Sequence, residues 1–182
     1  MTQPAPSVIT VANYIDGGWS QAASGATISG HVTDERGVAL PGVDLDFVVV
    51  ATGNSQSANN DVTDASGNYA TAVPNAVYDV SYTPPVGTRF AGHVQRNVNL
   101  TVNQTVAVVL RDAWLVSGTV IRADNGLPAV GVDLDFHDLA SGLKIFTPHD
   151  ATDLSGHYSV AVPKGIYRVN FDGPEPGLPT DP

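Results

Sequence analysis

The sequence contains no cysteine and few basic residues, and these two absences exclude several classes of protein. Without cysteine, disulfide bonds, thiol nucleophiles and thiolate-ligated metals are excluded. Only 8 lysines and arginines stand against 18 acids, which gives a formal net charge of -10. Because a chain with this negative charge repels phosphate groups, we expect no binding to nucleic acid or to anionic membranes. No apolar run reaches the length of a transmembrane helix, so membrane insertion is not expected either.

Long helical periodicity is also absent, whereas glycine and proline are frequent. The 18 glycines and 13 prolines separate short runs rich in β-branched and aromatic residues. Such runs, spaced about ten residues apart with turn residues between them, are typical of β-sandwiches. The sequence therefore predicts an all-β fold built from antiparallel, immunoglobulin-like sandwiches.

The first residues of the chain lack the basic and apolar regions of a signal peptide. Three interpretations stay open: a secreted chain given without its signal, a virion protein made in the cytoplasm, or a fragment of a longer chain. The segment that follows, residues 8–15, is β-branched and aromatic and is predicted to form one strand.

The hexapeptide Gly-Val-Asp-Leu-Asp-Phe occurs at residues 42–47 and again, unchanged, at 131–136. The same offset aligns residues 37–82 with 126–171 without a gap, and 20 of these 46 positions are identical. A match of that extent indicates an internal duplication. We therefore expect a β-sandwich in each repeat, and the predicted divisions are an N-terminal strand and linker (1–27), the first repeat (28–112), the second repeat (113–173) and a proline-rich tail (174–182).

Within the hexapeptide the apolar residues alternate with aspartates, which predicts a half-buried strand with its acids facing water. Aspartate is a poor strand former, so two in one strand need a reason. One interpretation is an acidic sheet face that discourages edge pairing. The other is a ligand or cation site, for which the candidates are Asp44, Asp46, Asp133 and Asp135.

The second repeat is shorter than the first at its end. The first repeat has 28 residues between Tyr82 and the end of its last predicted strand at Leu110, whereas only 11 residues follow Phe171 in the second. Four of those residues are proline, which cannot donate a backbone hydrogen bond within a sheet. We therefore predict that the second sandwich lacks its last two strands.

Three motifs recur in the same order in both repeats. A short strand with glycine and valine lies at residues 28–32 and 116–120, and Thr-Asp-x-x-Gly-x-Tyr follows at 63–69 and 152–158. Val-Pro-x-Gly-x-Tyr closes the second repeat at 162–167, with a weaker version at 73–78. This order resembles the carboxypeptidase regulatory-like (transthyretin-like, prealbumin-like) domain family. The resemblance implies a transthyretin-like sandwich and a role as spacer, adhesion module or accessory domain.

Two acidic pairs with equal spacing are weak candidates for calcium sites: Asp61 with Asp64, and Asp150 with Asp153. Calcium needs several hard oxygen ligands, and a turn carrying two acids could supply the first of them. The alternative is that Asp64 and Asp153 accept hydrogen bonds from the backbone of their own turns. No cofactor is expected, with calcium as the candidate that these acids leave open.

The second repeat also contains His137-Asp138 and His149-Asp150, which could meet across a hairpin and bind a transition metal. The first repeat has neither histidine at the matching positions, which favours solvated loop residues. No nucleophile elbow, phosphate loop or dinucleotide fingerprint is present. We therefore expect no catalytic residues.

A sandwich without its last strands would expose apolar core and unpaired backbone, which proteins avoid. The chain could continue beyond residue 182, its own residues 8–15 could fill the gap, or a neighbouring copy could donate that strand. Head-to-tail donation would produce an open filament. The residues expected to carry the donated strand are Val8, Ile9, Val11, Tyr14 and Ile15.

From these observations we expect a non-catalytic structural or adhesion module of an extracellular or particle-associated protein. Its partners would be other copies of itself or a neighbouring β-domain. The alternative is a calcium- or carbohydrate-binding accessory module of a larger secreted protein.

Overall fold

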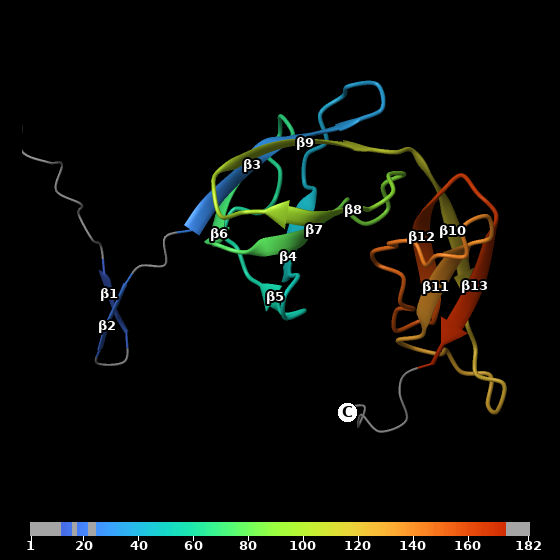
Figure 1. Ribbon diagram of the computed structural model, residues 1–182. Helices are drawn as coiled ribbons and strands as arrows, with labels where there is room; N and C mark the ends of the chain where they lie inside the picture. Colours follow the sequence, from blue (N-terminus) through green and yellow to red (C-terminus); the bar gives the residue numbers. More distant parts are fainter. Residues whose placement is uncertain (1–11, 16–17, 22–24, 174–182) are drawn as a thin grey trace, which may run out of the picture.

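The computed structural model describes residues 12–15, 18–21 and 25–173, and every regular element in these residues is a β-strand (Figure 1). The predicted all-β fold is therefore confirmed. None of these residues forms a helix that could cross a membrane. The first sandwich consists of seven strands: β3 (Gly25–Asp34), β4 (Asp44–Val49), β5 (Ser55–Gln56), β6 (Asn68–Pro74), β7 (Val77–Thr83), β8 (His93–Asn99) and β9 (Gln104–Leu110).

The seven strands form two sheets that enclose one core. One sheet has the order β6-β3-β9, in which β9 runs parallel to β3, and the other has the order β5-β4-β7-β8 and is antiparallel throughout. The alternation predicted for the hexapeptide is confirmed, because Val43, Leu45 and Phe47 are buried while Asp46 is exposed. Sixteen buried hydrophobic residues make up this core.

The second sandwich consists of four strands in two sheets of two: β10 (Ala113–Thr119) pairs with β12 (His157–Pro163), and β11 (Asp133–Asp138) pairs with β13 (Tyr167–Asp172). The pairing repeats that of the first sandwich. Gly118 lies opposite Tyr158 as Gly30 lies opposite Tyr69. Through residue 173 the second sandwich has no counterpart of β8 or β9, as predicted. Its buried hydrophobic cluster has four members.

The short link between the sandwiches is hydrogen-bonded to the first one. The Ala91 N–H donates to the Arg111 carbonyl at 2.9 Å, and the Ala113 N–H donates to the Arg89 carbonyl at 2.8 Å. Asp112, between these two bonds, also pairs with the Arg36 guanidinium at 3.3 Å. These contacts tie the start of β10 to the first sandwich.

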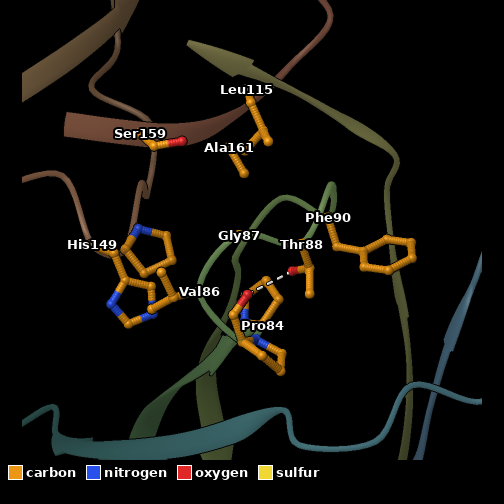
Figure 2. Close-up of a pocket in the computed structure, with 11 residues that line it drawn as sticks. Pro84, Val86, Gly87, Thr88, Phe90, Leu115, His149, Ser159 and Ala161 are labelled. Carbon is orange, nitrogen blue, oxygen red and sulfur yellow. Dashed lines mark hydrogen bonds between the residues drawn. The ribbon is translucent and has the colours of Figure 1, made fainter. Parts of the chain in front are cut away.

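The loop of residues 84–90 faces the second sandwich and lines a small cavity with it (Figure 2). Thr88 stabilises this loop by donating its hydroxyl to the Pro85 carbonyl at 2.7 Å. Nearby, Phe146 packs so closely on Gly92 that a Cβ added there would lie 2.7 Å from its ring. The residues of the second sandwich that line the cavity are Leu115, Pro148, His149, Ser159 and Ala161.

Two local predictions were wrong. The turn residues at 52–54 and 64–67 predict a polar strand near residues 57–63, but the strand there is β5, which ends at Gln56. A linker was expected over residues 21–27, but β2 (Gly18–Gln21) pairs with β1 (Ala12–Ile15), and Gly25 already belongs to β3. The Asp-Gly pair between β1 and β2 in the sequence is a typical hairpin signal. Residues 8–11 lie outside the described residues.

Candidate partner-binding interface

The aspartates of the first hexapeptide lie on the outer face of β4. Asp44 is half-buried and Asp46 is exposed. Burial raises the pKa of Asp44, and the neighbouring charges of Asp46 and Asp61 raise it further. On this face the carboxylates of Asp44, Asp46 and Asp61 therefore repel one another.

The matching aspartates of β11 have different surroundings. Asp133 is exposed, whereas Asp135 is half-buried and forms an ion pair with Lys144. The Lys144 pKa is raised, chiefly by its hydrogen bond to Asp135. The two hexapeptides therefore present different electrostatic surfaces despite their identical sequence.

Two of the four acids considered for calcium, Asp64 and Asp153, accept hydrogen bonds from the backbone of their own turns. The Asp64 carboxylate accepts hydrogen bonds from the Ser66 and Asn68 N–H groups at 2.8 and 2.9 Å. Asp153 accepts from the Ser155 and His157 N–H groups at 2.8 and 2.9 Å.

The backbone hydrogen bond from Asn68 lowers the pKa of Asp64, and the hydrogen bond from the Ser155 hydroxyl lowers that of Asp153. Burial raises the pKa of Asp150, whose carboxylate accepts a 2.8 Å hydrogen bond from the Thr147 hydroxyl. For Asp61 it is the backbone carbonyl, and not the carboxylate, that accepts a hydrogen bond, from the Leu45 N–H.

The structure does not gather these residues into a metal centre within the part of the chain that it describes. No group of three or more histidine or acidic side chains lies close enough there to hold an ion. His137 lies on β11 opposite Arg168, while His149 lies beside the cavity at the junction (Figure 2). The Asp138 carboxylate accepts hydrogen bonds from Ser141 and so belongs to a turn.

The second sandwich exposes apolar residues that are buried at the matching positions of the first. Trp114 and Val116 lie on the inner face of β10, since they pair with the buried Val162 and Val160. Trp114 is nevertheless 64% exposed and Val116 39%, whereas Ala26 and Ile28, their counterparts on β3, are at most 3% exposed.

The same difference occurs in the other sheet. Phe171 on β13 pairs with the fully buried Leu134, yet Phe171 is 49% exposed. In the first sandwich its counterpart Tyr82 is completely buried. The strands that cover these positions are β8 and β9, whose buried residues are Val98, Val108 and Leu110, and Leu100 directly after β8 is buried with them.

The free edges of β10 and β13, together with Trp114, Val116 and Phe171, therefore form the candidate interface, which we call the open edges. Among the described residues no strand pairs with either edge, and apolar side chains lie beside both. This combination can accept an added β-strand through main-chain hydrogen bonds and alternate side chains. Sequence reasoning anticipated the missing strands but did not identify these residues.

The donor candidates are only partly within the described residues. Tyr14 and Ile15 belong to β1, where they pair with Trp19 and Gly18 of β2. Val8, Ile9 and Val11 lie outside the described residues. Among the strands that are described, β1 pairs with β2 alone.

No protein-family model matches the sequence, and no curated protein is significantly similar to it. Solved structures match it with low similarity. A streptococcal ancillary pilin is 14% identical, with a TM-score of 0.37 over 87% of this chain and 62% of the pilin. The Bacillus anthracis TIE protein is 13% identical, with a TM-score of 0.35 over 84% of this chain and 29% of that protein.

The shaft pilin SpaA of Lactobacillus rhamnosus GG is 12% identical, with a TM-score of 0.35 over 85% of this chain and 90% of the pilin. This chain thus spans less than two thirds of the ancillary pilin and of the TIE protein. Similarities this low place the chain in no family, and the functional argument rests on the open edges.

Proposed function

We propose that this chain is a non-catalytic structural module of an extracellular assembly, and that a β-strand from another copy completes its second sandwich. The observation that carries this proposal is the exposure of Trp114, Val116 and Phe171 at positions that the first sandwich buries.

Completion of the second sandwich is energetically favourable. Burial of a large apolar side chain contributes about 1.5–3 kcal/mol, and the open edges offer several such residues. An added strand also pairs backbone groups along β10 and β13. The second sandwich has only four buried core residues of its own, so it gains more from such a strand than a complete sandwich would.

The donor in this proposal is the segment of residues 8–15 in the next copy. In a strand formed by this segment Ile9, Val11 and Ile15 share one face and Thr10 lies on the other, so the first face is largely apolar. Each copy would then carry one donor and one acceptor. A head-to-tail contact of this kind generates an open filament when the rotation between copies does not close a ring, and a filament fits a cell-surface or other extracellular location.

Light scattering of the purified chain, with and without residues 1–16, tests the proposal. We expect polymers of the whole chain and monomers after the deletion. Val11→Asp should also prevent assembly because it places a charge on the apolar face, whereas Thr10→Asp is the matched control on the opposite face. Monomers in every case would contradict the assembly, and polymers that survive the deletion would contradict the choice of donor.

A further inference from the structure

In the first sandwich, Gly30 and Tyr69 together hold one backbone carbonyl of β9. Gly30 lies opposite Val106 in the parallel pairing of β3 with β9. The backbones approach so closely that a Cβ added at Gly30 would lie 1.8 Å from the Val106 carbonyl oxygen. The Tyr69 hydroxyl donates a hydrogen bond of 2.8 Å to that same oxygen.

The second sandwich has the same pair of residues without the strand. Gly118 on β10 lies opposite Tyr158 on β12, in the register of Gly30 and Tyr69. No strand lies along the other edge of β10 in the described residues. The tyrosine hydroxyl lies beside the glycine in both sandwiches, but beside Gly118 no strand carbonyl accompanies it in the described residues. A Cβ added at Gly118 would lie 2.6 Å from the hydroxyl oxygen.

The Tyr158 hydroxyl also has no tyrosine hydroxyl beside it, in contrast to Tyr69 of the first sandwich. Tyr69 contacts the Tyr82 hydroxyl at 3.1 Å, but Phe171 occupies the matching position in the second sandwich and has no hydroxyl. The ring geometry is otherwise retained, with centroids 5.9 Å apart for Tyr158 and Phe171 and 6.0 Å for Tyr69 and Tyr82. Within residues 25–173, the Tyr158 hydroxyl makes no hydrogen bond.

We propose that Gly118 and Tyr158 are the seat for a backbone carbonyl of a strand that a second copy adds to β10, parallel to it. The Tyr158 hydroxyl donates to this carbonyl, and the absence of a side chain at Gly118 allows the strand to approach. This inference rests on the proposed function and adds the direction of the strand, its register and the two residues that fix it.

The pairing of β3 with β9 specifies the register. Residues on either side of Gly30 pair with residues on either side of Val106, namely Ser29 with Thr105 and His31 with Ala107. The matching positions on β10 are Ser117 and Thr119, which are both exposed. In the donor segment, Ile9 and Val11 have the spacing of Val106 and Val108, so Ile9 is assigned to the seat.

Peptide binding to the full chain tests the seat. The acceptor carries Val11→Asp, which prevents donation between copies, and the fluorescently labelled probes are peptides of residues 7–15 and 103–111. We expect both to bind. Tyr158→Phe should weaken binding about three- to tenfold through loss of one hydrogen bond. Gly118→Ala should weaken it at least about tenfold by steric exclusion, whereas Ser117→Ala should leave it unchanged.

Circular dichroism separates these effects from misfolding, because the two substitutions should leave the spectrum and the cooperative melting of the chain intact. The Cβ of Gly118→Ala would lie 2.6 Å from the Tyr158 hydroxyl oxygen and 2.8 Å from the nearest ring carbon, so the Tyr158 ring must shift, and the melting curve shows whether the fold tolerates this shift. Unchanged peptide affinity in both folded variants would overturn the seat. Binding of the 103–111 peptide alone would overturn the assignment of residues 7–15 as donor.

The absence of cysteine makes the orientation measurable by disulfide trapping. Ser117→Cys and Thr119→Cys chains are each mixed with 103–111 peptides that carry cysteine at Thr105 or at Ala107. A parallel strand should join Ser117→Cys to the first peptide and Thr119→Cys to the second, and the reverse preference would overturn the parallel direction.

The outcomes also separate this inference from the proposed function. If the chain polymerises through residues 1–16 but Gly118→Ala and Tyr158→Phe polymerise as the wild type does, the seat is wrong and the assembly stands. If the chain stays monomeric while the 103–111 peptide binds with the expected variant effects, the seat stands and assembly by residues 8–15 is wrong.

Discussion

Tyr82 and Phe171 occupy the same position in the two sandwiches, yet Tyr82 is fully buried and Phe171 is half-exposed. Both lie on the inner face, opposite Leu45 and Leu134 respectively. The difference arises from β8 and β9, which supply three buried residues to the first core and have no counterpart through residue 173. Within residues 25–173, the two sandwiches therefore share a register but differ in the strands that cover their inner faces.

Removal of the two aromatic rings should have unequal effects. Tyr82→Ala should lower the free energy of unfolding by about 3–5 kcal/mol, because it leaves a cavity in a packed core. Phe171→Ala should cost less than about 1.5 kcal/mol, since much of that ring already contacts water. Urea denaturation, followed separately for each sandwich by residue-resolved NMR, measures both values. Equal losses would contradict the exposure of Phe171.

Two buried threonines should be equally important to their sandwiches. The Thr63 hydroxyl donates to the Leu40 carbonyl and accepts the Val43 N–H, each at 2.8 Å. Thr152 makes the matching bonds at 2.7 and 2.9 Å. Replacement of either threonine by valine should cost about 1–3 kcal/mol, because it leaves buried backbone groups unpaired.

The exposed Thr105, changed to valine, is the control for these threonine substitutions and should be nearly neutral. Denaturant titration of the three variants makes the comparison. A control that loses as much stability as the buried variants would contradict the importance of the buried hydrogen bonds.

Asp44→Asn should stabilise the chain at neutral pH. The folded pKa of Asp44 lies above its unfolded value, since burial and neighbouring carboxylates disfavour the charged form. The wild type therefore gains stability as the pH falls through that folded pKa, and the advantage of the variant should vanish below about pH 4. Melting temperatures between pH 3 and pH 8 would show this trend, and high salt should reduce the part due to repulsion.

Asp64→Ala should have the opposite pH dependence. Hydrogen bonds from backbone N–H groups depress the folded pKa of Asp64, so its stabilising contribution is complete above the unfolded value of about 3.9. That contribution is lost as the pH falls through the folded pKa. The variant should melt below the wild type at pH 7, and the difference in melting temperature should narrow as the pH falls below about 3.9. A difference that does not narrow with falling pH would contradict this role.

The sequence predicted those strands in which apolar and polar residues alternate clearly or which follow a recognisable turn. The alternation around Leu45 and Phe47 identified β4, and the repeated turn at Asp64 identified the start of β6. The strand β5 was missed because two residues are too few to show a period. The pairing of β2 was missed although Asp-Gly is a hairpin signal.

The candidate interface was only partly predictable. Chain length after Phe171 indicated the missing strands, but the exposure of Trp114 depends on which strands cover it, and that is a property of the assembled sandwich. The sequence patterns also did not identify Gly118 and Tyr158 as a pair. Its signal is the recurrence of a glycine in the first strand together with a tyrosine after the Asp turn, and only the pairing of β3 with β9 shows what they hold.

Hydrogen exchange at the backbone amides of β10, measured as the chain passes from monomer to assembly, tests the central claim most directly. We expect the β10 amides that do not pair with β12 to exchange rapidly in the monomer and to become protected on assembly, while the β9 amides that pair with β3 remain unchanged as the internal reference. Assembly without added protection in β10 would contradict strand addition at this edge.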